Sequence, residues 1–185
     1  MSLYNFQFYL KIQIYIYISI MPHAAPELYR NNIKENDNRN TPQRAWEDIL
    51  QYIPPKTKLW LPFYNDGMAL KIVNNLGYKN VTHVDKDFFT YDISDAFVID
   101  NPPYTIKSKI IDKLNKTNRP FALLLPLPTV GRQYIKKYKN NLQILIPYKR
   151  YNFLSHTTVT PPFKCCWFCW NMERYLDTKD KLIWL

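Results

Sequence analysis

The sequence predicts an α/β domain built on an open, largely parallel β-sheet, and three observations support this prediction. Nearly continuous apolar runs, typical of strands that are buried on both faces, occur at residues 96–99, 121–127 and 142–146. Segments with the apolar spacing of amphipathic helices lie between them. The first run leads into Asn101-Pro102-Pro103-Tyr104, where the prolines end the strand because neither can donate a ladder hydrogen bond. Open parallel sheets bind ligands at the carboxyl ends of their strands, so this tetrapeptide marks the expected site.

Composition indicates a globular chain with a polyanionic partner. The 185 residues can form one domain with a sizeable core, and contents of 46% hydrophobic and 16% aromatic residues are typical of globular proteins. The formal net charge is +10 and the pI is near 9.4, with Lys and Arg crowded between residues 107 and 150. This basic balance favours nucleic acid as the partner.

The cysteines argue against a metal site and against a disulfide framework. Cys165, Cys166 and Cys169 lie together, and no second Cys or His pair occurs at ligand spacing. We therefore expect no metal. We interpret residues 165–170 as a buried apolar strand of a protein from a reducing, intracellular compartment.

Residues 1–40 are expected to form an N-terminal extension of a domain that spans residues 41–185. Within residues 1–20, isoleucines alternate with other residues up to Ile20, a period typical of a β-strand. A membrane span is disfavoured because Lys11 interrupts the segment and leaves an uninterrupted apolar remainder far shorter than the roughly 20 residues a spanning helix needs. Either translation begins at Met21 or this segment adds an edge strand. The polar residues 21–40 are predicted to form a flexible arm.

The domain is predicted to begin with a helix, followed by a strand–turn–helix unit. Thr41-Pro42 has the pattern of an N-cap and first helical residue, and the helix stops before Pro54. A strand at residues 59–64 leads into the turn Asn65-Asp66-Gly67 and a second helix that ends at Gly77. Such a unit exposes backbone N–H groups at a helix N-terminus, where a carboxylate can bind.

The next strand, residues 81–84, ends close to two acidic residues. In nucleotide-type sites an acidic residue at this position takes the ribose hydroxyls, and Asp85 is the better candidate for that role. Asp87-Phe88 follows directly. Because the distance to the strand at 96–99 is short, a third strand is expected to be abbreviated or missing.

The second half of the domain is rich in basic residues. A helix from Ile106 to Leu114 is predicted to have a solvated outer face that carries Lys107, Lys109, Lys113 and Lys116. A basic helix is expected at residues 131–138, and the loop at 147–153 interleaves basic and aromatic residues. Such a loop can hold phosphate and stack an extruded base, although its aromatics could equally belong to the core.

The tetrapeptide offers specific chemistry to an aminated planar ring. The ring can stack on Tyr104, and its NH2 group can donate to the Asn101 side-chain oxygen and to the Pro102 carbonyl. Two acceptors would favour the pyramidal nitrogen that attacks an electrophilic methyl group. No strong base is needed, because the methylated amine becomes acidic.

On these residues the chain resembles the S-adenosylmethionine-dependent adenine-N6 DNA methyltransferases, in particular the compact phage and viral type. The tetrapeptide matches their Asn/Asp-Pro-Pro-Tyr/Phe motif, and Pro62, Phe63 and Gly67 match their glycine turn. Leu61 stands where they have an acidic residue that faces the cofactor's ammonium, and Asn65 replaces a glycine, which is tolerable because Asn accepts a positive φ. The resemblance implies a three-layer α/β/α, Rossmann-like class I methyltransferase sheet, mostly parallel with a terminal antiparallel strand.

The same resemblance, together with the local patterns described above, gives a set of expected site residues. Those expected in catalysis are Asn101, Pro102, Pro103 and Tyr104. Those expected to bind the cofactor are Thr41, Pro42, Pro62, Phe63, Tyr64, Asn65, Asp66, Gly67, Asp85, Asp87 and Phe88, with Asp87-Phe88 on the adenine of the cofactor. Those expected to bind substrate are Lys107, Arg132, Lys149, Arg150 and Phe153, of which Arg150 and Phe153 match an Arg-x-x-Phe pattern of the family.

Methylation of adenine N6 in DNA is the function that the sequence favours, with three alternatives. The same chemistry on RNA adenine is close to it. A protein-glutamine methyltransferase would use the same tetrapeptide, but the basic surface argues against it. A catalytically silent nucleic-acid-binding subunit would account for Leu61 but not for the intact tetrapeptide. No sequence-reading domain remains, so site specificity is expected to be short or to come from a partner or a second copy.

Overall fold

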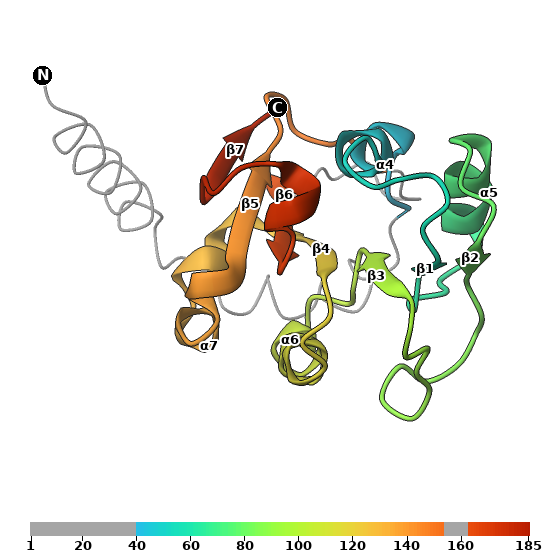
Figure 1. The fold of residues 1–185 in the computed structure, drawn as a ribbon, viewed down its shortest axis with the longest axis horizontal. Coiled ribbons are helices and arrows are strands. Elements are labelled where there is room, and N and C mark those ends of the chain that lie inside the picture. Colours follow the sequence, from blue (N-terminus) through green and yellow to red (C-terminus); the bar gives the residue numbers. More distant parts are fainter. Residues whose placement is uncertain (1–39, 154–162) are drawn as a thin grey trace, which may run out of the picture. The chain divides into compact units, whose positions relative to one another are not determined.

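The computed structural model describes residues 40–153 and 163–185 (Figure 1). The predicted N-terminal strand and nearly all of the predicted arm lie outside these residues. The described elements are α4 (Gln43–Leu50), β1 (Leu59–Trp60), α5 (Met68–Asn75), β2 (Val81–Thr82), β3 (Phe97–Asp100), α6 (Lys107–Lys116), β4 (Phe121–Pro126), the 3-10 turn η1 (Leu127–Gly131), α7 (Gln133–Lys136), the 3-10 turn η2 (Lys139–Asn141), β5 (Leu142–Ile146), β6 (Cys165–Trp170), α8 (Glu173–Leu176) and β7 (Leu182–Trp184).

The described strands form one mixed sheet in the order β2-β1-β3-β4-β6-β5-β7. Strands β2, β1, β3 and β4 are parallel to one another, whereas β6 is antiparallel to both of its neighbours. The α/β class is therefore confirmed. No strand is formed between β2 and β3, in agreement with the short spacing in the sequence.

The antiparallel strand is not the terminal one, which corrects the sequence prediction. After β6 the short helix α8 reverses the chain, and β7 adds to the outer edge of the sheet parallel to β5. Neither element was predicted, because a four-residue helix and a three-residue strand are too short to show a clear period. The Gln143 amide supports this connection by donating to the carbonyls of Thr178 at 2.8 Å and Asp180 at 3.0 Å.

Several predicted elements are shorter than their apolar patterns. Strand β1 stops at Trp60 rather than residue 64, because Pro62 has no N–H to continue the ladder. Of the predicted basic helix at 131–138, only Gln133–Lys136 is α-helical, and 3-10 turns flank it. The N-cap of α4 is Pro42 rather than Thr41, and no side chain caps this helix.

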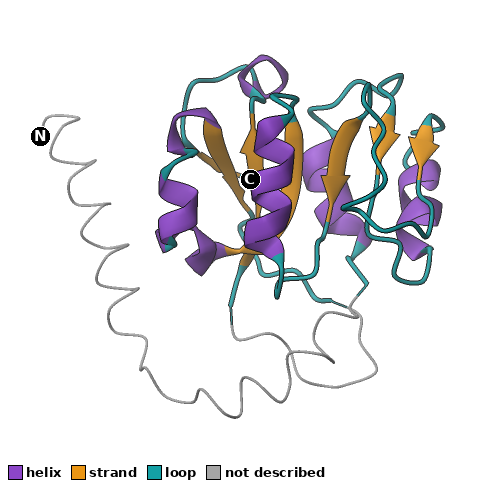
Figure 2. Ribbon diagram, turned by 90° about the horizontal axis from the view of Figure 1, so that it is seen from below, coloured by secondary structure: helices purple, strands orange, loops and turns teal. Residues whose placement is uncertain are grey.

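Helices cover both faces of the sheet (Figures 1 and 2). Because side chains alternate along a strand, each buried strand contributes to two apolar layers. One layer packs under α4, α5 and α8, and the other under α6 and α7. In β6, for example, Trp167 and Cys169 belong to the first layer, whereas Phe168 and Trp170 belong to the second.

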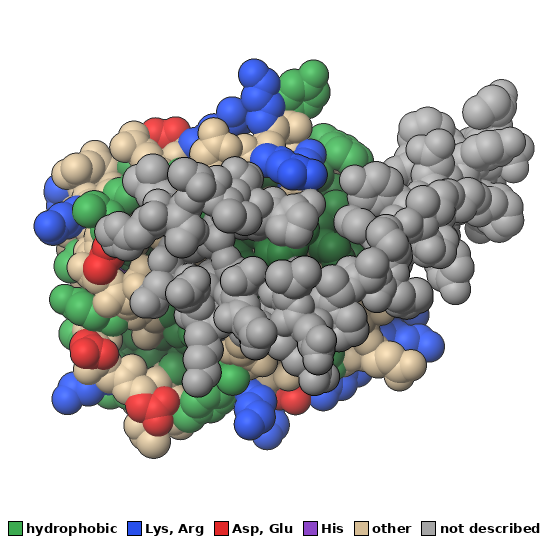
Figure 3. All heavy atoms as spheres, turned by 180° about the vertical axis from the view of Figure 1, so that it is seen from behind, with side chains coloured by type: hydrophobic (Ala, Val, Ile, Leu, Met, Phe, Trp, Pro, Cys, Tyr) green, Lys and Arg blue, Asp and Glu red, His purple; other side chains and the backbone are tan. Residues whose placement is uncertain are grey.

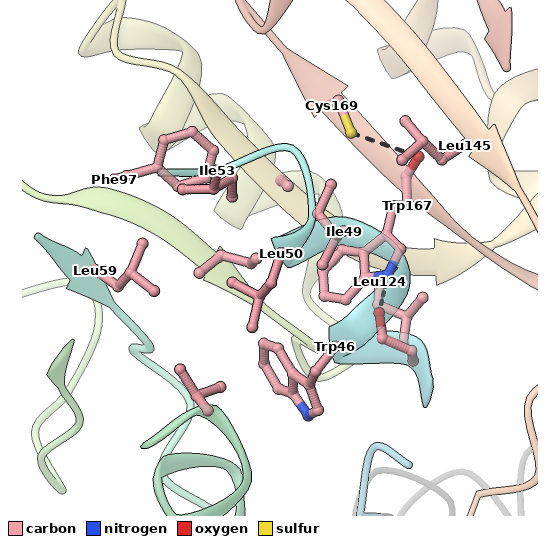
Figure 4. Close-up of a cluster of buried hydrophobic side chains, with 14 of the residues drawn as sticks. Trp46, Ile49, Leu50, Ile53, Leu59, Phe97, Leu124, Leu145, Trp167 and Cys169 are labelled. Carbon is pink, nitrogen blue, oxygen red and sulfur yellow. Dashed lines mark hydrogen bonds between the residues drawn. The ribbon is translucent and has the colours of Figure 1, made fainter. Parts of the chain in front are cut away.

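The first layer is organised by two tryptophans from distant parts of the chain (Figure 4). Trp46 of α4 and Trp167 of β6 are fully buried with ring centroids 5.6 Å apart. The indole N–H of Trp167 donates to the Ala45 carbonyl at 2.7 Å and so fixes α4 against the centre of the sheet. This contact holds the start of α4, which borders the pocket described below.

No helix in the described part of the chain is long and apolar enough to cross a bilayer.

Candidate functional site

A pocket of about 330 Å³ lies at the carboxyl ends of β1, β2 and β3. Its volume is within the range of small-molecule sites. The structure gathers ten of the predicted site residues on its wall: Thr41, Pro62, Phe63, Tyr64, Asn65, Asp66, Asp87, Phe88, Asn101 and Pro103. The same pocket therefore contains residues predicted for the cofactor and for catalysis.

The first wall is the turn between β1 and α5. Asn65 adopts a positive φ of 46°, as predicted for a residue that replaces glycine, and Gly67 at φ 76° is the N-cap of α5. One Asp66 carboxylate oxygen accepts from the Met68 N–H at 2.9 Å, and the other accepts from the Asn40 amide at 2.8 Å. Both bonds lower the pKa of Asp66 below its ordinary value, and the bond from the Met68 N–H has the larger effect. The turn is thus held by a carboxylate that is charged near neutral pH.

The second wall is the segment after β2. Phe88 is buried between Phe63 and Trp60, with ring centroids at 5.3 and 5.8 Å. Lys113 of α6 does not lie on a solvated face as predicted. Its ammonium donates to the Phe88 carbonyl and lies 4.6 Å from the centre of the Phe88 ring. Because the outward lysine pattern of α6 gives no sign of this contact, the sequence could not show that Lys113 anchors the pocket wall.

The third wall is the tetrapeptide after β3. Asn101 and Pro103 line the pocket, whereas Pro102 is buried and does not line it. The side-chain oxygen of Asn101 is buried and has no hydrogen-bond partner among the described residues. A buried acceptor without a donor is costly for a folded protein. This oxygen therefore lacks a donor within the described residues, and a bound molecule would have to supply one.

Asp100 joins two of these walls, and sequence reasoning did not identify it. Its carboxylate accepts from the Phe63 N–H at 2.7 Å and from the Asn101 N–H at 2.8 Å. The side chain is 3% exposed and contributes to the pocket wall. Burial raises the pKa of Asp100 to about 8, against the opposing effect of the two N–H donors. An acidic residue within an otherwise apolar strand was the signal that could have found it.

Tyr104 does not line the pocket, although it was predicted to stack on the substrate there. Its hydroxyl lies 3.4 Å from the Cys165 sulfur, and its ring meets Phe163 edge to face at 6.3 Å. The turn after Pro103 carries the side chain toward β6. The stacking role of Tyr104 therefore remains a prediction that this arrangement does not display.

Other predicted cofactor residues also lie off the pocket wall. Asp85 is exposed, and Lys86 and Asp87 line the pocket in its place. Pro42 and Gly67 begin helices next to the pocket without lining it. Pocket residues that sequence reasoning missed are Asn40, Met68, Ala69, Lys86, Phe89, Asp100 and Ile106.

The predicted substrate residues lie outside the pocket wall. Arg132, Lys149 and Arg150 are exposed, whereas Phe153 packs against the first apolar layer. The Lys107 ammonium donates to the Tyr104 carbonyl at 2.7 Å. On the described part of the face in Figure 3, basic side chains are spread around the periphery with acidic ones between them.

Thiol and metal chemistry have little support among the described residues. The three cysteines are buried, and burial raises the pKa of Cys166 to about 12 and that of Cys169 further. Both thiols are therefore protonated near neutral pH and are poor nucleophiles. No group of three or more His, Cys, Asp or Glu in the described ranges is placed to hold a metal ion.

Neither family models nor curated proteins match this chain. The functional interpretation therefore depends on the residues and geometry of the chain itself.

Proposed function

We propose that this protein transfers a methyl group from S-adenosylmethionine to adenine N6 in DNA. The observation that carries the proposal is the Asn101 side-chain oxygen, buried without a partner among the described residues, in a pocket that also contains the Asn65–Asp66 turn. An exocyclic amine would supply the missing donor. The intact Asn-Pro-Pro-Tyr sequence supports the same chemistry.

The sheet supports the proposal at the level of fold. A parallel set β2-β1-β3-β4 with an antiparallel strand inserted beyond it is compatible with a Rossmann-like class I methyltransferase. We propose that fold for this chain, with β7 as an addition at the edge. Because one fold serves many functions, this support is an analogy and the site carries more weight.

The pocket residues fit the parts of S-adenosylmethionine, which supplies an electrophilic methyl group when bound. The turn at Asn65 and Gly67 presents the N-terminus of the eight-residue helix α5, where backbone N–H groups can bind a carboxylate. Phe88 offers an aromatic surface and Asp87 an acceptor for the adenine of the cofactor. Tyr64, Met68 and Phe89 are partly exposed apolar side chains on the same wall.

Asn101 would act on the substrate amine. Its oxygen and the Pro102 carbonyl would each accept one N–H, which draws the nitrogen lone pair out of the ring and orients it. Asp100 fixes the Asn101 backbone through the 2.8 Å bond to its N–H. The adenine must leave the duplex to reach this pocket. The exposed Arg132, Lys149 and Arg150 are available for contacts with phosphate.

Incubation with labelled S-adenosylmethionine and either DNA, RNA or protein tests the proposal. We expect label in DNA and N6-methyladenine in its digested nucleosides by mass analysis. Label in RNA alone would favour the RNA enzyme, and label in protein would exclude both.

The silent subunit is favoured by one observation. Leu61, where the family has an acidic residue, is fully buried in the apolar core and offers nothing to a cationic ligand. Calorimetry decides between an active methyltransferase and the silent subunit. Folded protein that binds DNA but gives no heat with S-adenosylmethionine would support the silent subunit.

A further inference from the structure

The pocket wall contains a buried acid, Asp100, at the end of β3. Just after β1, Leu61 stands where the resembled family has an acidic residue. Strands β1 and β3 are parallel neighbours, with Trp60 paired to Val98. Asp100, two residues beyond Val98, therefore borders the segment that begins with Leu61, as its 2.7 Å bond to the Phe63 N–H shows. An acid at the end of β3 can thus reach the same space as an acid at the end of β1.

We propose that Asp100 is the residue that binds the positive charge of the ligand in this pocket, in place of the acid that Leu61 cannot supply. The inference rests on the proposed function, since it assumes a cationic cofactor. S-adenosylmethionine carries two such groups, an ammonium and a sulfonium.

The Asp100 carboxylate is held in place and still has capacity to accept. Each oxygen receives one backbone N–H, at 2.7 and 2.8 Å, and each keeps a further lone pair. The side chain is buried on the pocket wall, where a charge interaction is screened little by water. A cation that reaches it gains a strong, charge-assisted contact.

The other charged groups on the wall are less suited to this role. Asp66 is exposed, and its two oxygens already accept from Met68 and Asn40. Asp87 is exposed and accepts from the Phe89 N–H at 2.9 Å. Lys86 has the same charge as the ligand group. Lys107, at the start of α6, is directed to the Tyr104 carbonyl.

Binding should release a proton, because burial holds the pKa of Asp100 near 8 in the free protein. A cation stabilises the ionised carboxylate and so lowers this pKa. Near pH 6 we expect the full-length protein to release about one proton for each S-adenosylmethionine bound. Calorimetry in two buffers with different ionisation enthalpies measures this number. Uptake of a proton, or no exchange, would overturn the assignment.

A ligand series with Asp100→Asn identifies the charged group. The probes are S-adenosylmethionine, S-adenosylhomocysteine, which lacks the sulfonium, and 5′-methylthioadenosine, which lacks both charges. We expect the variant to lose about tenfold to hundredfold in affinity for a charged ligand and little for the uncharged one. If the variant loses affinity for both charged ligands, Asp100 binds the ammonium. If it loses affinity for S-adenosylmethionine alone, Asp100 binds the sulfonium.

Equal loss for all three probes, or no loss, would overturn the role of Asp100. Asp95→Asn is the matched control, since it removes one carboxylate from the segment just before β3, which begins at Phe97, and Asp95 pairs there with Lys58 at 2.7 Å. If wild-type protein binds neither charged ligand, the proposed function fails. If it binds them and the variant binds equally well, this inference alone fails. The proton count, which needs no variant, decides the case in which Asp100→Asn does not fold.

Discussion

The carboxylate of Asp100 accepts a hydrogen bond at 2.7 Å from the backbone N–H of Phe63, a residue 37 positions earlier in the chain. The bond joins the end of β3 to the loop after β1. Through its second bond, to the Asn101 N–H, the same carboxylate connects that loop to the tetrapeptide. The two halves of the pocket are therefore positioned by one buried side chain. Displacement of the loop after β1 should shift the tetrapeptide, and displacement of the tetrapeptide should shift the loop.

Asn101→Ala should abolish methyl transfer without destabilising the protein. The Asn101 oxygen has no partner among the described residues, so its removal relieves an unsatisfied buried group. We expect turnover to fall by about 100-fold or more, cofactor affinity to change little and Tm to stay equal or rise. Labelled-methyl kinetics, calorimetry and thermal melting measure these three quantities.

Asn101→Asp is the control for that variant, because it keeps an acceptor of the same shape. It should retain more activity than Asn101→Ala. Equal loss of turnover and of cofactor affinity in Asn101→Ala would contradict the assigned role.

The ligand-free protein should lose stability as pH rises from 3.8 to about 8, because these are the pKa values of Asp100 in the unfolded and folded states. Its pKa is raised from an ordinary 3.8 to about 8 by folding. Between these two values the folded state therefore binds more protons than the unfolded state. The stabilising contribution of protonated Asp100 is complete below pH 3.8 and is lost as the pH passes 8. The lowered pKa values of Asp66 and Asp112 act in the opposite direction and in more acidic solution.

Thermal melting at several pH values checks this dependence. Asp100→Asn should melt lower at pH 5 but show a flatter decline toward pH 9. A wild-type Tm that is constant or rises over this range would contradict the assignment of the buried acid.

Gly67→Ala should destabilise the protein by about 1–2 kcal/mol because of its left-handed conformation. A Cβ at this position would also lie 3.2 Å from the Tyr64 hydroxyl, on the pocket wall. Gly77→Ala is the matched control, since its φ is also positive, at 96°, but nothing lies within 4 Å. Both variants should lose similar stability in urea titrations, and Gly67→Ala alone should weaken ligand binding. Equal binding by the two would show that the turn does not contact the ligand.

Trp167→Ala should cost about 3–5 kcal/mol of unfolding free energy. The side chain is fully buried and its indole N–H is bonded to the Ala45 carbonyl at 2.7 Å. Trp184→Ala is the control, since Trp184 in the edge strand β7 is 65% exposed and its removal should change stability by about 0.5 kcal/mol or less. Urea unfolding followed by circular dichroism measures both. A small effect of Trp167→Ala would mean that α4 is not held by this contact.

Replacing Lys149 and Arg150 together by alanine should weaken DNA binding and reduce its salt dependence. Both residues are exposed just beyond the carboxyl end of β5, the sheet edge that carries the pocket. Loss of two phosphate contacts should lower the slope of log K against log salt by about 2. The control replaces Lys56 and Lys79, which precede β1 and β2 and so lie at the opposite edge. An equal effect of both pairs would indicate non-specific attraction by net charge.

The sequence by itself determined the apolar strands β3, β4, β5 and β6, the amphipathic helices α4, α5 and α6, and the loop that carries the tetrapeptide. Each is specified by a local signal, either a continuous apolar run, a helical period or a pair of prolines. The positive φ of Asn65 and the glycine at the end of α5 were likewise visible, since few residues adopt that conformation.

Only the tertiary structure decided which of these residues meet. It inserted β6 between β4 and β5, added β7, turned Tyr104 toward Cys165 and brought Lys113 onto Phe88. It also placed Asp100 beside Phe63, a contact that depends on β1 and β3 being neighbours in the sheet. Local periodicity reports which face of an element is buried but not what is packed against it. The buried acid Asp100 and the unpartnered oxygen of Asn101 arise from that packing.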